Sequence, residues 1–243
     1  MSDKLDILIF GAHGDDAEIG MAGTIAKQVA AGYSVGLCDL TEAELSSNGN
    51  VVLRKEEAAE AAKVLGVKVR HNLGLPDRGL YVNPEQIAAV TEVIRKYQPS
   101  IIFAPYWEDR HPDHIACSRL VEEAAFNAKL RRYMPDKPAV QAPDLYFYFI
   151  NDWRTPDLLV DVTDYYMTKE AALECYRSQF GQSSMNENED VAPTPLNQGY
   201  VERVKARDAL LGQRKLIPYA EGFAVKTPYV VNIFGSRNSV VMD

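Results

Sequence analysis

LDILIFGAHGDDAEIG, residues 5–20, is the segment from which the class of fold follows. Residues 5–10 form a continuous apolar run that ends at Gly11, which predicts a buried strand. Residues 18–31 are compatible with a helix and stop at a turn at Gly32. The segment therefore predicts a strand, a loop and a helix in succession.

The same alternation of strand and helix continues through the first half of the chain. Pro84 suits the first turn of a helix, and Pro99 ends that helix before the next strand. Such repeats favour an α/β fold, a Rossmann-like doubly wound and mostly parallel sheet with helices on both faces. The predicted strands are 33–40, 67–73, 100–104, 145–150 and 157–160, and the further helices are 51–65, 84–97, 163–176 and 199–211.

Length and composition are those of one ordinary globular domain. The chain has 243 residues, of which 47% are hydrophobic and 25% charged, and no linker-like segment divides it. We expect a single domain over residues 1–243. Residues 181–198 are polar and contain two prolines, which predicts a long surface loop, and loops of this kind often act as mobile lids.

Charge and hydropathy exclude several classes of partner. The net charge is -8, and the 26 lysines and arginines form no dense basic stripe, so we expect no binding to nucleic acid. No apolar stretch approaches the roughly 20 residues needed to span a bilayer, and the first residues do not resemble a signal peptide. We therefore expect a cytoplasmic protein without a membrane partner. Cys38, Cys117 and Cys175 lack metal-site spacing and are expected to be apolar packing residues.

Two short loops concentrate the side chains that carry chemistry. In an open parallel sheet, ligands bind outside the carboxyl ends of the strands. The loop at 11–18 follows the first predicted strand, and the loop at 108–114 follows the fourth. Three of the four histidines lie in these loops, and so do several aspartates. His13 with Asp16, and His111 with His114, have a three-residue spacing that can point both side chains the same way.

A divalent metal is the simplest explanation of this clustering. Either loop alone could be a helix cap or a surface pair, but two such loops at adjacent strand ends favour a metal site. Imidazole and carboxylate are good zinc ligands, and a catalytic zinc site has three protein ligands with a fourth position for water. Facing carboxylates also need a cation or protons to neutralise them. The glycines of residues 11–20 do not fit GxGxxG, and neither GxSxG nor a Walker loop is present.

These motifs resemble the LmbE-like or PIG-L superfamily of metal-dependent N-acetylglucosaminyl deacetylases. The chain has AHGDD at 12–16 and HPDH at 111–114, where the superfamily has signatures similar to AHPDD and HPDH. Gly14 stands where the family usually has proline, which loosens the loop backbone without removing a ligand. The match looks closest to the branch that deacetylates N-acetylglucosaminyl malate in bacillithiol biosynthesis, because CDLTEAELSSNG, RKEEA, LPDRGLY, APYWEDRHPDH and TPLNQGYVE are similar to its sequences.

The resemblance implies an LmbE-like fold and a hydrolase that acts on the acetamide of an N-acetylglucosamine conjugate. The implied cofactor is Zn²⁺, although the same ligands also accept Fe²⁺, Co²⁺ or Mn²⁺. A homo-oligomer is expected from relatives. The alternatives are a deacetylase of a chitooligosaccharide or a mycothiol-type conjugate, and a metal-binding or sugar-binding protein without turnover. The implied metal ligands are His13, Asp16 and His114.

The other implied roles belong to residues around this metal. Asp15 matches the general base, and a protonated His111 is expected to stabilise the oxyanion, with Asp113 orienting it. Arg54, in RKEEA, matches an arginine of the substrate pocket, and Tyr200, in GYVE, matches a pocket tyrosine. Arg54 could instead be an exposed partner for a nearby glutamate, so its place in the fold distinguishes the two interpretations.

Overall fold

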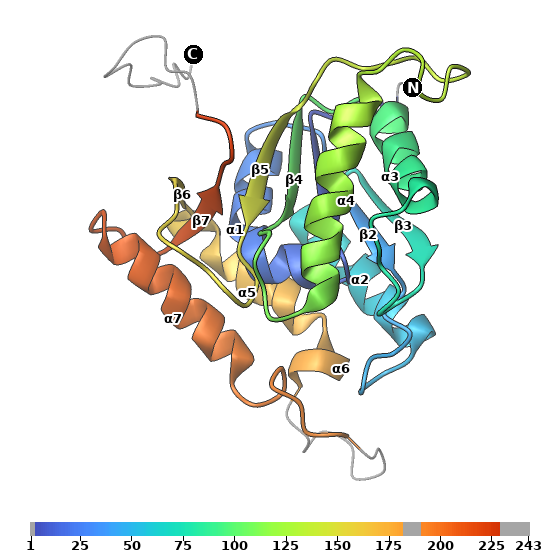
Figure 1. Ribbon diagram of the computed structural model, residues 1–243. Coiled ribbons are helices and arrows are strands. Elements are labelled where there is room, and N and C mark those ends of the chain that lie inside the picture. Colours follow the sequence, from blue (N-terminus) through green and yellow to red (C-terminus); the bar gives the residue numbers. More distant parts are fainter. Residues whose placement is uncertain (1–2, 182–190, 229–243) are drawn as a thin grey trace.

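The structure is a computed structural model that describes residues 3–181 and 191–228, in which one mixed sheet runs through the molecule (Figure 1). The strand order is β3-β2-β1-β4-β5-β7-β6, and the first five strands are parallel, whereas β7 runs antiparallel to both of its neighbours. The strands are β1 (Ile7–Gly11), β2 (Val35–Thr41), β3 (Val69–Leu75), β4 (Ile101–Pro105), β5 (Asp144–Tyr148), β6 (Leu158–Asp161) and β7 (Ala220–Ala224).

Helices cover both faces of this sheet, as the doubly wound prediction requires (Figure 1). In β1, Leu8 and Phe10 pack into the core under α3 and α4, while Ile7 and Ile9 pack into the core under α1 and α5. This alternation explains why the sequence of β1 is apolar at every position. The helices are α1 (Asp16–Ala30), α2 (Val51–Leu65), α3 (Pro84–Tyr97), α4 (Pro112–Ala128), α5 (Tyr166–Glu174), α6 (Arg177–Phe180) and α7 (Tyr200–Gln213).

The predicted α/β class and mostly parallel sheet are confirmed, with differences in the second half. Neither α4 nor β7 was predicted as an element, and the predicted helix 163–176 is a 3₁₀ turn followed by α5. Of the predicted loop 181–198, residues 182–190 lie outside the described residues, and 191–198 contain neither helix nor strand. None of the described helices is long and apolar enough to cross a membrane.

The order in which strands are added to the sheet reverses between β1 and β4, because β2 and β3 lie on one side of β1 and β4 and β5 lie on the other. β1 pairs with β2 on one side and with β4 on the other, where Ile7 lies opposite Ile101. The loop after β1 leads into α1 and the loop after β4 leads into α4, on the opposite face. Because adjacent connections diverge here, a crevice opens at the carboxyl ends of the two strands. Both predicted metal loops lie at this position.

Helix α1 is broken one turn after it begins. Met21 has φ -154° and ψ 22°, which is outside the helical region. Arg207 Nη2 donates to the carbonyl of Ile19 at 2.9 Å, before the break. After the break, the Glu221 carboxylate accepts the N–H groups of Gly23 at 3.0 Å and Thr24 at 2.6 Å. The short first segment that carries Asp16 is therefore held from α7 and β7.

Candidate active site

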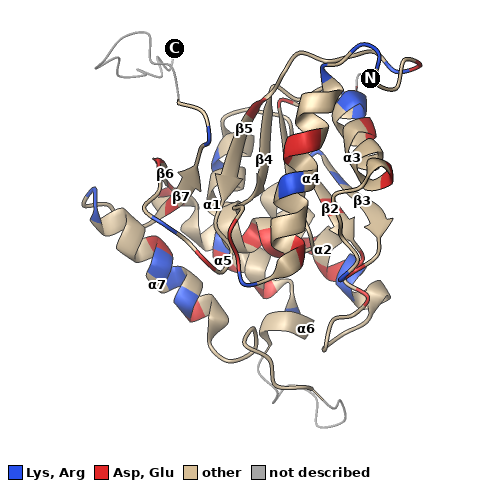
Figure 2. Ribbon diagram, viewed as in Figure 1, with Lys and Arg blue, Asp and Glu red and all other residues tan. Residues whose placement is uncertain are grey.

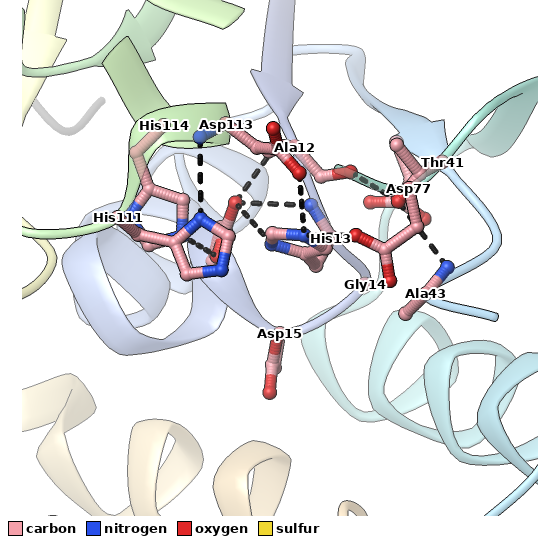
Figure 3. Close-up of polar contacts among 12 residues, drawn as sticks. Ala12, His13, Gly14, Asp15, Thr41, Ala43, Asp77, His111, Asp113 and His114 are labelled. Carbon is pink, nitrogen blue, oxygen red and sulfur yellow. Dashed lines mark hydrogen bonds and ion pairs between the residues drawn. The ribbon is translucent and has the colours of Figure 1, made fainter. Parts of the chain in front are cut away.

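Asp16 organises the loop after β1. Its Oδ2 accepts the N–H groups of Ala12 at 2.8 Å and His13 at 3.0 Å, which folds the loop back over the start of α1. The Oδ2 atom also lies 3.7 Å from His13 Nδ1, and Oδ1 lies 3.1 Å from His114 Nε2. The three residues predicted as metal ligands are thus brought together around the Asp16 carboxylate, from loops on neighbouring strands. Figure 3 shows His13 and His114 of this set.

The second loop places His114 at the start of α4. Pro112 occupies the first helical turn and His111 is the N-cap residue. The Nδ1 atom of His114 lies 3.0 Å from Asp109 Oδ1. Asp109 is itself held, because its carboxylate accepts the N–H of His111 at 2.8 Å and the side-chain amide of Asn151 at 2.9 Å. Asp109 therefore lies within ion-pair distance of His114 Nδ1 while Nε2 faces Asp16, although Nδ1 has no partner of hydrogen-bond geometry among the described residues.

The donor atoms fit a divalent cation. Ligand atoms of His13, His111 and His114 lie within 4.8 Å of one another, as do those of His13, Asp77 and Asp113. Nitrogen and carboxylate oxygen in this number are the ligands that zinc and its first-row neighbours accept. No ion pair with Lys or Arg is found for Asp16, Asp77 or Asp109 in residues 3–181 and 191–228, so histidines and a cation are left to balance them.

The pKa shifts of His114 and Asp77 reflect how closely carboxylates and imidazoles lie together in this site. Burial alone would lower the pKa of His114, but Asp16 and Asp109 outweigh it and raise the pKa to about 9. Burial would raise the pKa of Asp77, yet the contact with His13 lowers it to about 2. The carboxylates thus favour the protonated forms of His13 and His114. A divalent cation at this position would replace those protons.

Asp15 lies beside Arg54 at the edge of the same cavity. The two side chains are buried, and Arg54 Nη2 lies 3.3 Å from Asp15 Oδ1. The Nη1 atom of Arg54 is buried without a hydrogen-bond partner in the part of the chain that the structure describes. Figure 3 shows Asp15 pointing away from the histidine cluster. Arg54 is therefore a buried residue of the cavity. It is not exposed at the surface, as the alternative interpretation of the sequence required.

His111 and Asp113 are neighbours, but their contact differs from the expected one. The backbone N–H of Asp113 donates to His111 Nδ1 at 3.2 Å. The Asp113 carboxylate accepts the N–H of Arg78 at 2.7 Å and lies 3.1 Å from Arg78 Nη1. Burial, followed by the charges of His114 and His13, lowers the pKa of His111. Its Nδ1 accepts, and Nε2 carries the hydrogen.

Tyr200 also lines the cavity. Its hydroxyl donates to Asn151 Oδ1 at 2.9 Å, and the phenol stacks on Phe180 with ring centroids 6.1 Å apart. The cavity has a volume of about 430 Å³, within the range of about 300–1,000 Å³ typical of small-molecule sites. Among the predicted site residues, those that line it are His13, Asp15, Asp16, Arg54, His111, His114 and Tyr200, whereas Asp113 lies behind His13.

Two aspartates with no assigned role complete this cluster. Asp77, just after β3, lies 3.3 Å from His13 Nε2 and accepts the N–H of Leu45 at 3.0 Å. Asp109 orients His114. Both follow strand ends, so the rule that ligands bind at the carboxyl ends of parallel strands could have found Asp77 as well as the two loops. The sequence could not show which nitrogen each carboxylate faces.

A buried charged network supports the first metal loop from behind. The guanidinium of Arg70 donates to Asp39 Oδ2 at 2.7 Å, to Glu18 Oε1 at 2.6 Å and to the carbonyl of Gly14. The hydroxyl of Tyr176 also donates to the Gly14 carbonyl. Two donors thus hold the peptide that precedes Asp15, which compensates for the flexibility of glycine at this position.

Comparison with known proteins places this geometry in a family. The model of the PIG-L family, described as GlcNAc-PI de-N-acetylase, matches residues 8–125, which include both metal loops. The chain is 31% identical to diacetylchitobiose deacetylase of Thermococcus kodakarensis, over 74% of this chain and 72% of that protein. It is 27% identical to 4-oxalmesaconate hydratase of Pseudomonas putida, over 71% and 73% of the two chains.

A deacetylase of the predicted branch and a solved structure are also similar. The probable N-acetyl-α-D-glucosaminyl L-malate deacetylase 2 of Bacillus subtilis is 27% identical, over 72% of this chain and 84% of its own. The crystal structure of the conserved protein TT1542 from Thermus thermophilus matches with a TM-score of 0.85 and 38% identity, over 96% of this chain and 99% of the other. Because the family model includes both loops and the Thermococcus deacetylase is 31% identical over most of both chains, the protein is an enzyme of the PIG-L, or LmbE-like, family of deacetylases.

Proposed function

We propose that the protein is a zinc-dependent deacetylase of N-acetylglucosamine conjugates and that its substrate is N-acetylglucosaminyl malate. The observation that carries the chemistry is the convergence of His13, Asp16 and His114 beside Asp15, in one cavity at the reversal point of the sheet. Asp15 is a buried carboxylate that contacts none of the proposed metal ligands. Its position suits a general base, and a protein that only binds metal or sugar has no need of one.

His13, Asp16 and His114 would hold the metal. When bound, a zinc ion would supply Lewis-acid chemistry, since it lowers the pKa of a bound water to about 7 and polarises the acetamide carbonyl. Asp16 lies 3.1 Å from His114 Nε2 and 3.7 Å from His13 Nδ1, which supports this set, while the ligand atoms of His111, Asp77 and Asp113 also converge on His13. Asp109 keeps His114 in the orientation that presents Nε2.

Asp15 acts as the proton carrier. It accepts the proton of the attacking water as the water oxygen bonds to the acetamide carbon, and it returns that proton to the amine nitrogen as the C–N bond breaks. The products are the free glucosamine conjugate and acetate. Arg54, whose Nη2 lies 3.3 Å from Asp15 Oδ1, holds this carboxylate in place.

His111 stabilises the carbonyl oxygen of the acetamide. Because its Nδ1 accepts the N–H of Asp113, the hydrogen on Nε2 is free to donate to the negative charge that develops on that oxygen. Asp113 orients His111 through its backbone, while its carboxylate holds Arg78. Tyr200 lines the same cavity and would contact the sugar.

The malate assignment rests on sequence similarity and on the cations of the cavity. The motifs around residues 38–49, 54–58 and 194–202 are similar to the N-acetylglucosaminyl malate branch, and a relative of that name matches over most of its length. Arg54 Nη1 is a buried donor without a partner in the described chain, suited to a carboxylate or sugar hydroxyl.

The test is the release of free amine and acetate from N-acetylglucosaminyl malate by the purified protein. We expect turnover that a chelator abolishes and zinc restores, with a higher kcat/KM than for N-acetylglucosamine. Preference for diacetylchitobiose over the malate conjugate would contradict the substrate. Metal binding without acetate release from any of the three compounds would contradict deacetylation itself.

A further inference from the structure

Three segments that are distant in the sequence form one wall of the active-site cavity. Residues 45–47 come from the loop between β2 and α2, Gln179 comes from α6, and residues 194–196 come from the chain before α7. We call residues 191–198 the wall segment, and Figure 2 shows no charged residue in it. A wall of apolar and neutral side chains is suited to the hydroxyls and apolar faces of a sugar ring.

The side chain of Asn48 attaches the wall segment to the rest of the protein. It is buried, its Oδ1 accepts the N–H of Ala192 at 2.8 Å, and its Nδ2 donates to the carbonyl of the same residue at 2.9 Å. A primary amide has an acceptor and a donor side by side, so it matches both polar groups of one residue. In residues 3–181 and 191–228, no other group outside the wall segment hydrogen-bonds to residues 191–196.

The backbone that carries Asn48 is held from two helices. The carbonyl of Asn48 accepts a hydrogen bond from Gln179 Nε2 at 3.0 Å. The preceding residue of α6, Ser178, donates its N–H and its hydroxyl to the carboxylate of Glu57, both at 2.7 Å. Glu57 is buried on α2. The position of Asn48 therefore depends on α2 and α6 and not on the wall segment.

The wall segment forms a turn with hydrogen bonds of its own. Asn197 Oδ1 accepts the N–H of Thr194 at 2.9 Å, and Asn197 Nδ2 donates to the carbonyl of Ala192 at 3.0 Å. Leu196 packs against the core cluster that contains Tyr200. Because these contacts hold the turn together, the bonds of Asn48 to Ala192 determine where the whole turn lies against the cavity.

We infer that Asn48 is a positioning residue for the sugar. Its amide holds the wall segment against the cavity, and the affinity for the N-acetylglucosamine ring depends on that hold. The inference rests on the proposed deacetylase function. Asn48 itself does not line the cavity, whereas Thr194 and Leu196 do, so Asn48 acts through them. A wall that contacts the sugar equally before and during the reaction contributes to KM and not to kcat.

The first experiment measures kcat, KM and zinc content in Asn48→Asp, with N-acetylglucosaminyl malate as the substrate. Aspartate keeps an acceptor for the Ala192 N–H, but it sets a carboxylate oxygen against the Ala192 carbonyl. We expect KM to rise about tenfold, the effect of losing one hydrogen bond of a buried group. We expect kcat and zinc content to stay at the parent values, which a general loss of folded enzyme would not allow.

Asn72→Asp is the matched control. Asn72 also bonds two backbone groups, since its Nδ2 donates to the carbonyl of Thr41 at 2.7 Å and its Oδ1 accepts the N–H of Gly74 at 2.8 Å. It lines a different cavity, and neither of its bonds reaches the wall segment. The same chemical change there should leave KM at the parent value.

A double substitution tests whether Asn48 acts through the wall segment. Leu196→Ala removes an apolar side chain of the wall and should raise KM as well. Independent effects multiply, whereas two residues that act through one contact do not. We expect the rise in KM for Asn48→Asp with Leu196→Ala to be smaller than the product of the two single rises. A full product would overturn the inference.

Amide hydrogen exchange of Ala192 tests the hold of Asn48 without any ligand. In Asn48→Ala, which removes the acceptor, we expect this exchange to be about tenfold faster than in the parent. Unchanged exchange in Asn48→Ala, or unchanged KM in Asn48→Asp, would overturn the inference and leave the proposed function standing. Calorimetric binding of the malate conjugate that Asn48→Asp weakens, without acetate release by the parent, would support the inference and overturn the deacetylase. Neither binding nor turnover in the parent would overturn both.

Discussion

The Oε2 atom of Glu221 accepts the amide N–H of Thr24 at 2.6 Å, so a strand at one side of the sheet caps a helix segment behind the candidate active site. Lys169 Nζ lies 2.7 Å from Glu221 and 2.8 Å from Asp208, and all three side chains are fully buried. Asp208 in turn pairs with Arg207, which holds the Ile19 carbonyl. This chain of charges joins α7 to the two segments of α1.

Glu221→Ala should be strongly destabilising. The substitution leaves Lys169 short of a buried partner and two N–H groups without an acceptor, and the expected loss in the free energy of unfolding is about 3–5 kcal/mol. Urea denaturation measures it. The matched control is Glu170→Ala, whose partner Lys205 is exposed, and there we expect about 0–1 kcal/mol. Similar losses in the two variants would contradict the role of the buried chain.

Asp15→Asn and His114→Ala should separate catalysis from metal binding. Asp15 contacts Arg54 and none of the proposed ligands, so its amide variant should keep bound zinc and lose at least about 100-fold in kcat, the range of a general base. His114→Ala should lose the metal as well, because one imidazole and one carboxylate hold zinc poorly. Zinc content by mass spectrometry and turnover are measured on the same samples, and equal zinc retention would refute these assignments.

Asp109→Asn should weaken metal binding without removing a ligand. The carboxylate lies 3.0 Å from His114 Nδ1 and keeps that imidazole basic and oriented. Loss of such a partner typically reduces metal affinity about 10- to 100-fold. Competition with a chromogenic chelator gives the dissociation constant of zinc. Glu108→Gln changes the neighbouring exposed carboxylate and should leave that constant at the parent value.

Two glycines of the same helix-and-loop segment should respond oppositely to alanine. At Gly14 an added Cβ would lie 3.5 Å from the Cβ of Ala58, an ordinary contact, and the backbone φ is not positive. We expect Gly14→Ala to stabilise by about 0.4–1 kcal/mol. At Gly20 the Cβ would lie 2.2 Å from Tyr148 Cδ2, and the hydroxyl of Tyr148 is fixed on the Phe10 carbonyl. Gly20→Ala should therefore lower the melting temperature; a loss of stability at Gly14 would show that the loop needs glycine.

The stability contribution of Asp6 should depend on pH. Hydrogen bonds from the Ser34 hydroxyl and N–H lower the pKa of Asp6 below its ordinary value of 3.8. The folded state therefore gains stability above that value and loses it as the pH falls through the lowered pKa. Ser34→Ala should cost about 1 kcal/mol at pH 7, and the difference from the parent should shrink below about pH 3. A difference that persists at acid pH would assign it to packing.

The first half of the fold follows from the sequence because its elements are regular. The run of residues 5–10 is apolar at every position, since both faces of β1 are covered, and Asn83 and Pro84 mark the start of α3 with a cap and a first-turn proline. Strand β7 could not be predicted in the same way. It contains a glycine and the buried Glu221, whose partners Lys169, Gly23 and Thr24 are distant in sequence.

The candidate site, like the fold, could be predicted only in part from the sequence. The two loops that contain the histidines could be identified, because residue type and position after a strand are visible in the sequence. The partner of each side chain could not, since it depends on how loops from different strands meet. Asp113 was expected to orient His111; its backbone N–H donates to that ring, whereas its carboxylate accepts from Arg78. The carboxylate of Asp109 lies next to the other histidine of the loop, His114.

The reversal of the chain between β1 and β4 also bears on how the protein assembles during folding. Asp6 and Ser100 are 94 positions apart in the chain, yet Ser100 bonds to the carbonyl of Asp6 at the start of the two strands. Parallel pairing over such a separation closes a long loop, and contacts of this kind form slowly. His13 and His114 meet only after that closure, so the proposed zinc ion should bind tightly only to chains in which the two strands are paired. Metal uptake during refolding would therefore report the time at which the centre of the sheet forms.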